Sequence, residues 1–163
     1  MSVIERIAVT CPTFVMLKHE DWPGLDKLTA VRARERHGMR RLSILSGNCG
    51  IFLPFELARG ADGAMTGYAF PEMLVEVYRL MAAGRRSEAH DLFDAHLPLV
   101  RYEQQPAIGL AVRKYVLRRR GVLKSDAQRT PGSAVSRETA AEIDFTLERL
   151  QRATACRTLR VAS

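Results

Sequence analysis

The first half of the chain alternates short apolar runs with longer amphipathic segments. The short runs have the length and composition of strands that are buried in a parallel sheet. The longer segments carry apolar residues at three- and four-residue spacing, which predicts helices packed on that sheet. The predicted strands are residues 13–17, 42–45 and 62–67, and the predicted helices are residues 3–9, 21–37, 51–59 and 71–83. This order favours an α/β fold with parallel strands and right-handed crossovers.

The second half of the chain, after Gly84, has helical periodicity throughout. Helices are predicted over residues 87–102, 106–120 and 136–152, with a loop at 125–135 around a Thr-Pro-Gly-Ser turn. We therefore expect three parts: an α/β part at residues 1–84, a helical segment at 85–152 and a flexible tail at 153–163.

A lysine, Lys18, directly follows the first apolar run. The carboxyl end of a parallel strand is where α/β folds place their chemistry. Removal from water there would lower the pKa of an amine and make it a usable nucleophile. Taken alone, the run and its lysine are better described as a strand end whose lysine points to solvent. The rest of the chain has to decide between the two.

Composition narrows the class of protein. The 163 residues, 47% hydrophobic and 26% charged, are enough for one domain with a real core. No apolar run approaches the roughly 20 residues of a membrane span, and the N-terminus lacks the layout of a signal peptide, so we expect a cytoplasmic protein without membrane contact. The net charge of +7 raises the possibility of nucleic-acid binding. Only residues 118–120 form a compact basic run, at a predicted helix end, and this disfavours nucleic acid.

The three cysteines and four histidines are widely spaced. They form neither a disulfide framework nor a metal-ligand pattern, so we expect reduced thiols and no metal or other cofactor.

Four motifs in register resemble the C-terminal half of the dihydrodipicolinate synthase/N-acetylneuraminate lyase family, the class I pyruvate-dependent lyases. The residues Lys-His-Glu at 18–20 resemble the family's Schiff-base lysine segment, and Leu-Ser-Gly-Asn at 45–48 resembles the exit of its strand seven. The segment at 60–66 resembles strand eight of the family's barrel. The segment at 84–99 resembles the helix pair that follows the barrel. Within the family, segments at 102–103, 121–127 and 129–131 look most like the 2-keto-3-deoxy sugar acid dehydratase branch.

The resemblance implies a partial TIM (β/α)8 barrel: the last three β/α units, roughly strands 6–8, followed by the helical segment. It also implies that Lys18 forms an imine with pyruvate or a 2-keto-3-deoxy sugar acid, in an aldolase or dehydratase reaction. Backbone groups of Ser46 and Gly47, with Met65 and Thr66, would line the substrate pocket. For Thr66 a packing role is equally open. Asn48 stands where the family usually has an acidic residue, which puts a charge role at that position in doubt.

Other parts that the resemblance implies are absent from the sequence. The family's proton-shuttling tyrosine and its carboxylate-binding hydroxyl pair belong to strands 1–5, and no tyrosine precedes Lys18. Two hypotheses follow: a truncated or split lyase, or a catalytically inactive remnant that acts as an oligomerising or partner-binding module. In both cases we expect a homo-oligomer or a complementary half-barrel chain, because three strands leave both sheet edges unpaired. The isolated chain is predicted not to be a stable monomer.

Overall fold

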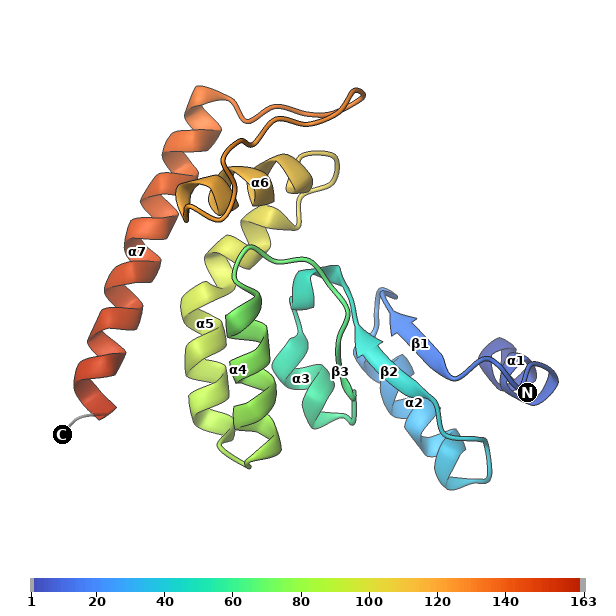
Figure 1. Ribbon diagram of the computed structural model, residues 1–163. Coiled ribbons are helices and arrows are strands. Elements are labelled where there is room, and N and C mark those ends of the chain that lie inside the picture. The colour runs from blue at the N-terminus through green and yellow to red at the C-terminus, as the bar shows by residue number, and fades with distance from the viewer. Residues whose placement is uncertain (1, 162–163) are drawn as a thin grey trace.

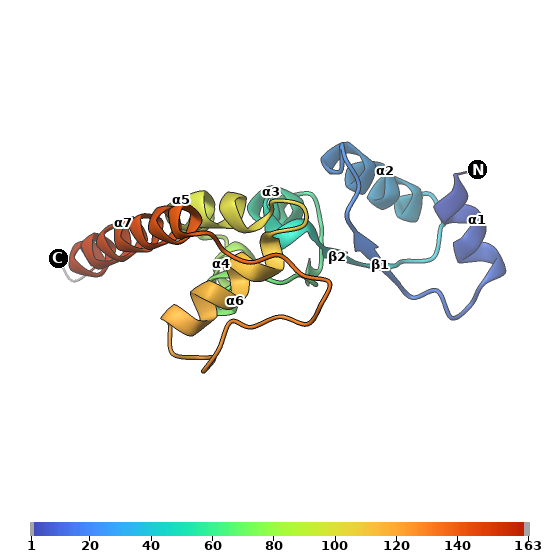
Figure 2. The ribbon, with the colours of Figure 1, turned by 90° about the horizontal axis from the view of Figure 1, so that it is seen from above.

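The computed structural model describes the backbone of residues 2–161 and the side chains of residues 2–155. Figure 1 shows an elongated molecule with a small sheet and its helices on one side and a group of longer helices on the other. The view from above shows α1 and α2 at one end and α7 at the opposite end (Figure 2). The elements are α1 (Val3–Thr10), β1 (Met16–His19), α2 (Leu25–Arg36), β2 (Ser43–Ser46), η1 (Asn48–Gly50), α3 (Leu53–Ala58), β3 (Gly63–Ala64), α4 (Pro71–Ala82), α5 (Arg86–Glu103), α6 (Gly109–Arg119) and α7 (Arg137–Val161).

The three strands form one parallel sheet in the order β1-β2-β3. Lys18 pairs with Leu45, and Leu45 pairs in turn with Gly63. The predicted alternation of helices and parallel strands is therefore confirmed.

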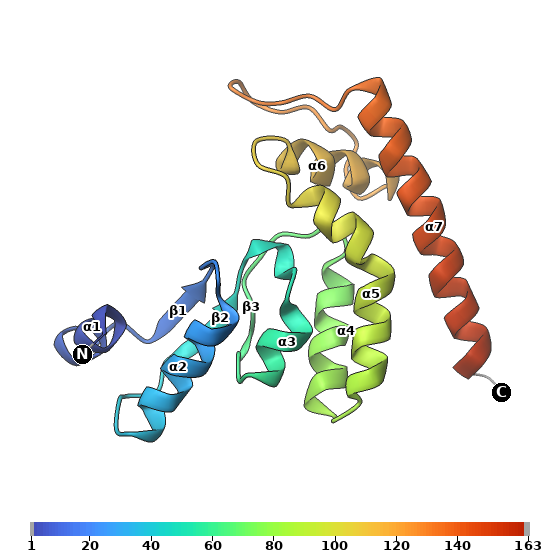
Figure 3. The same cartoon turned by 180° about the vertical axis from the view of Figure 1, so that it is seen from behind.

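The two faces of the sheet have different surroundings. Successive strand residues point to opposite faces, so Leu17 and His19 share a face with their register partners Ile44 and Ser46. This face is covered by helices, and Ile44 packs into a small core with Leu28, Val31 and Ala61. Lys18 and Leu45 lie on the opposite face. No helix of the described chain covers this face, and in Figure 1 the strands lie in front of α2. Figure 3, seen from behind, shows the side of the sheet on which α2 lies.

The larger core belongs to the helical segment and to α3. It contains buried residues of α4, α5, α6 and α7 together with the loop that leads into α4. Its best-buried aliphatic side chains are Leu53, Val77, Leu99, Val100, Val112, Val116 and Ile143. The predicted helices of the second half are confirmed, with α5 and α6 within a few residues of the predicted bounds.

The first strand differs from its prediction. It was expected over residues 13–17 and buried on both faces, but β1 runs from Met16 to His19. The preceding Val15 is 61% exposed and Met16 is 37% exposed. The reason is that β1 is the edge of the sheet, and the apolar residues before it have no neighbouring element to pack against in the described chain.

The last helix is longer than predicted. It was expected to end near residue 152, but α7 continues to Val161. Flexibility of the tail at 153–163 stays a prediction, and its residues 162 and 163 lie outside the described part. Among the described residues no helix is both long enough and apolar enough to span a membrane.

Candidate active site

The exits of the three strands are joined by backbone hydrogen bonds. The Gly47 N–H donates to the His19 carbonyl at 2.9 Å, and the Met65 N–H donates to the Ser46 carbonyl at 2.8 Å. Parallel strands place their carboxyl ends at one edge of the sheet, and these bonds bring the predicted positions to that edge. The structure therefore places the backbone of Lys18, Ser46, Gly47 and Met65 close together.

Lys18 lies on the uncovered face of the sheet. Its side chain is 44% exposed, and its Nζ forms an ion pair with Glu20 Oε1 at 3.2 Å. The expectation that the amine is removed from water is wrong for this chain by itself. The physical reason is the uncovered face: nothing in the described residues covers the amine on the side opposite the helices.

Ser46 points away from Lys18. Its side chain is fully buried on the helix-covered face, with His19 as register partner. The Ser46 hydroxyl lies near the Glu56 carboxyl but has no hydrogen bond of normal geometry. Burial raises the pKa of Glu56, and the Ser46 hydroxyl and His19 oppose that rise. Only the backbone of Ser46 can therefore contribute to a pocket around Lys18.

The third strand exit combines exposed and packed residues. Met65 is 40% exposed, whereas Thr66 is half-buried. A Cβ at Gly50 would lie 3.8 Å from Thr66 Cγ2, so the Thr66 methyl packs near the η1 turn. This contact supports the packing role for Thr66 and leaves its hydroxyl available.

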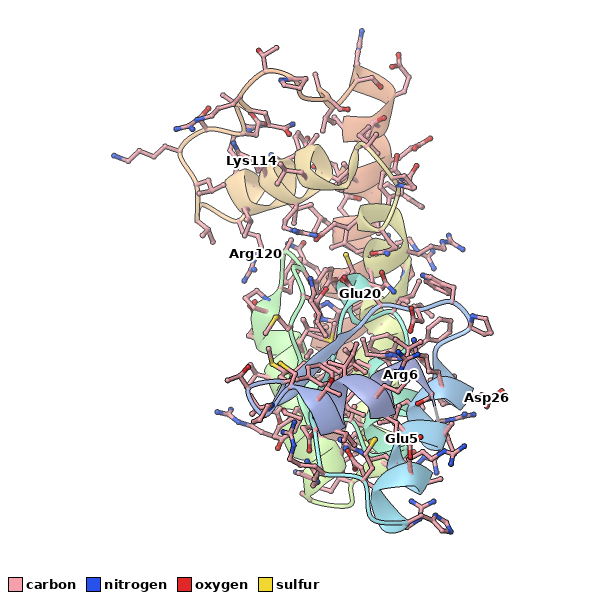
Figure 4. The ribbon with its side chains drawn as sticks, turned by 90° about the vertical axis from the view of Figure 1, so that its right-hand side faces the viewer. Glu5, Arg6, Glu20, Asp26, Lys114 and Arg120 are labelled. Atoms are coloured by element: carbon pink, nitrogen blue, oxygen red, sulfur yellow. The ribbon has the colours of Figure 1, made fainter. Side chains whose placement is uncertain are left out.

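Glu20 is a feature of the site to which the sequence interpretation gave no role. Its Oε1 accepts from the Asn48 N–H at 3.4 Å, besides pairing with Lys18. Figure 4 shows Glu20 at the end of the sheet nearer to α6, whereas Glu5 and Arg6 of α1 lie farther from it. The sequence position of Glu20 could have predicted this contact, because Glu20 follows the first strand and the carboxyl ends of neighbouring parallel strands lie at one edge of the sheet.

A buried ion pair supports the strand exits from the helical side. Arg113 of α6 pairs with Glu103 of α5, and Glu103 Oε2 accepts from the Ala69 N–H at 3.1 Å. Arg113 Nη2 also donates to Cys49 Sγ at 3.5 Å. Burial raises the pKa of both Cys49 and Glu103. Cys49 is thus held as a buried thiol, which makes it an unsuitable nucleophile.

No group of three or more His, Cys, Asp or Glu side chains within the described residues is arranged to hold a metal ion. The polar groups at the strand exits are an amine, a carboxylate, an amide and backbone groups. Such a set can bind an organic carbonyl compound and form a covalent bond to it through the amine.

The sheet and the position of Lys18 place the chain among α/β proteins that carry an amine at the carboxyl end of a parallel strand.

No family model matches the chain. A curated L-2-keto-3-deoxyarabonate dehydratase of Azospirillum brasilense is 33% identical over 97 residues, which are 60% of this chain and 31% of that protein.

Solved structures match more of the chain. A dihydrodipicolinate synthase from Rhodopseudomonas palustris is 57% identical with a TM-score of 0.88, over 90% of this chain and 49% of that one. A 4-hydroxy-tetrahydrodipicolinate synthase from Methylacidiphilum fumariolicum SolV, 23% identical with a TM-score of 0.78, has the same fold over 93% of this chain and 49% of that one. The chain is thus similar in sequence and fold to a dihydrodipicolinate synthase, and it spans about half the length of these structures.

Proposed function

We propose that this chain forms strands 6–8 of a (β/α)8 barrel and carries the imine-forming lysine of a lyase, Lys18. The substrate class is pyruvate or a 2-keto-3-deoxy sugar acid. The observation that carries the proposal is the position of Lys18, at the carboxyl end of β1 and on the face opposite the helices. The 57% identity to a dihydrodipicolinate synthase supports it.

The chemistry uses the Lys18 amine as a nucleophile. Nζ attacks the keto carbon, a carbinolamine forms, and loss of water gives an iminium cation. This cation accepts the electron pair of a C–H bond on the adjacent carbon, or of the C–C bond from that carbon to the next, and becomes an enamine. In a dehydration the enamine then expels the hydroxyl group of the next carbon, which leaves with its bonding pair and takes up the released proton as water. The backbone at Ser46 and Gly47 and the side chains of Met65 and Thr66 line the pocket beside the imine.

The remaining parts of the site come from protein outside this sequence. The uncovered sheet face and the unpaired edges of β1 and β3 suit the addition of further strands. Those strands would cover Lys18, remove it from water, and bring a proton donor and a group that binds the substrate carboxylate. In this proposal residues 1–84 are barrel and residues 85–152 an appended helical segment, and α7 extends beyond that segment to Val161.

The proposal is tested by trapping the imine with borohydride. Incubation with pyruvate and borohydride should give a stable adduct on Lys18, located by peptide mass spectrometry. Lys18→Arg keeps the charge, cannot form an imine, and should abolish the adduct. Lys27→Arg, a change at another exposed lysine that is paired with Asp21, is the matched control and should leave it unchanged.

A second candidate function is a non-catalytic module that binds copies of itself or a complementary half-barrel. The solvent exposure of the Lys18 amine favours this second function, because an exposed lysine is not activated as a nucleophile by removal from water. A folded sample that associates in light scattering but gives no adduct, even with a complementary half-barrel added, would favour this second function.

A further inference from the structure

The Glu20 carboxylate lies between Lys18 and the turn that follows β2. Glu20 Oε1 is 3.2 Å from Lys18 Nζ and 3.4 Å from the Asn48 backbone nitrogen. One oxygen therefore accepts from the amine at one strand exit and from a backbone N–H at the next.

The side chain of Glu20 is placed by the shape of that turn. A Cβ added at Gly47 would clash with the Cγ, Cδ and Oε1 atoms of Glu20. Any residue other than glycine at position 47 would displace the Glu20 side chain from this place. The Gly47 N–H donates to the His19 carbonyl, which fixes the two strand exits relative to each other.

Both polar atoms of the Asn48 side-chain amide form hydrogen bonds, one of them to the backbone of Glu20. Its Nδ2 donates to the Glu20 carbonyl at 3.1 Å, and its Oδ1 accepts at 3.5 Å from Nε2 of Gln104, the residue that directly follows α5. Its φ of 50° lies in the left-handed region, which asparagine adopts more readily than most residues. An aspartate in the same conformation would have no proton to donate to the Glu20 carbonyl and would face that carbonyl oxygen with a negative charge.

We infer that Glu20 is a positioning residue that holds the Lys18 amine toward the β2 exit, and that the neutral Asn48 makes this placement possible. The inference rests on the proposed function, since positioning matters only if Lys18 is the nucleophile. Both side chains of the ion pair are nearly half exposed, and such pairs add little to folding stability. The effect of Glu20 is therefore expected in the reaction of Lys18 and not in the stability of the fold.

A double-mutant cycle tests the inference by the rate of borohydride trapping with pyruvate. Glu20→Gln and Asn48→Asp should each slow trapping about fivefold, the size of one ion pair in a water-like environment. The double variant should also be slowed only about fivefold, because both changes remove the same placement. Asp26→Asn, which alters an exposed acid paired with Arg59, is the matched control and should trap at the wild-type rate. A double variant slowed about 25-fold, as independent effects would give, or single variants that trap as fast as the wild type would overturn the inference.

A second measurement does not depend on pyruvate. A carbodiimide joins amines and carboxylates that are in contact, so it should link Lys18 to Glu20 in the wild type and do so less in Asn48→Asp. The contact between Lys27 and Asp21 serves as an internal positive control. If this link forms as expected but pyruvate gives no adduct, the proposed function fails and the placement of Glu20 stands. If the Lys27–Asp21 cross-link forms and the Lys18–Glu20 cross-link does not, the inferred contact between Glu20 and Lys18 is wrong.

Discussion

The helical segment and the sheet region differ in how they bury their apolar side chains. The α4–α7 segment, with α3, encloses a large core of its own residues. The sheet region has only a small core around Leu28 and Ile44. Helices satisfy their own backbone and bury one face against neighbours that are close in sequence, whereas a short parallel sheet needs cover on both faces. The contrast agrees with the proposal that other protein completes the sheet region.

The largest expected effect is a difference in the free energy of unfolding that two equally buried leucines lose on change to alanine. Leu99 of α5 and Leu28 of α2 are each 1% exposed, the first in the large core and the second in the small one. Leu99→Ala should lower the free energy of unfolding by about 4 kcal/mol and Leu28→Ala by about 2 kcal/mol, because a site with few neighbours collapses more readily around the cavity. Urea denaturation measures both. Equal losses would contradict the contrast between the two cores.

A smaller effect is expected at the buried pair that joins the two regions. Glu103→Gln leaves the Arg113 guanidinium without a charged partner, and should lower the free energy of unfolding by about 2 kcal/mol. The matched change Glu88→Gln alters an exposed ion pair with Arg85 and should cost about 0.5 kcal/mol or less. A loss at Glu103 no greater than that at Glu88 would show that this link contributes nothing to joining the regions.

The smallest effect is a pH dependence in the sheet region. Burial raises the pKa of Glu56 above that of the unfolded chain, so its contribution to stability is fully present below the unfolded pKa, about 4.3. That contribution is lost as pH rises through the folded pKa. Gln at this position cannot ionise. The stability of Glu56→Gln relative to the wild type should therefore increase from pH 4 to pH 7, as followed by thermal or urea unfolding. A difference that stays constant over this range would mean that Glu56 is not held in a desolvated state.

The sequence was sufficient for the order of the elements and for the position of Lys18. Apolar periodicity and glycine and proline signals located the helices, because these signals are local. The extent of β1 could not be predicted from the apolar run at residues 13–17. The Val15 carbonyl accepts from the Ser43 N–H of β2, but the Val15 side chain is exposed and β1 begins only at Met16.

The parts of the site that were missed depend on contacts between distant segments. The side chains at 103 and 113 lie on different helices, and no local pattern shows that they pair beneath Ala69. The burial of Ser46 on the face opposite Lys18 follows from the register of β2 against β1, which a strand prediction without exact bounds leaves open.

Gly67 has a consequence for how this sequence can vary. The Arg113 guanidinium lies directly against its Cα, where any added Cβ would clash with it. A replacement at position 67 therefore forces the Arg113 guanidinium away from its partners Glu103 and Cys49. A saturation library over positions 65–68 should be depleted of replacements at 67, even though glycine has no side chain that could reach Lys18. Second-site suppressors should appear at position 113 as shorter side chains.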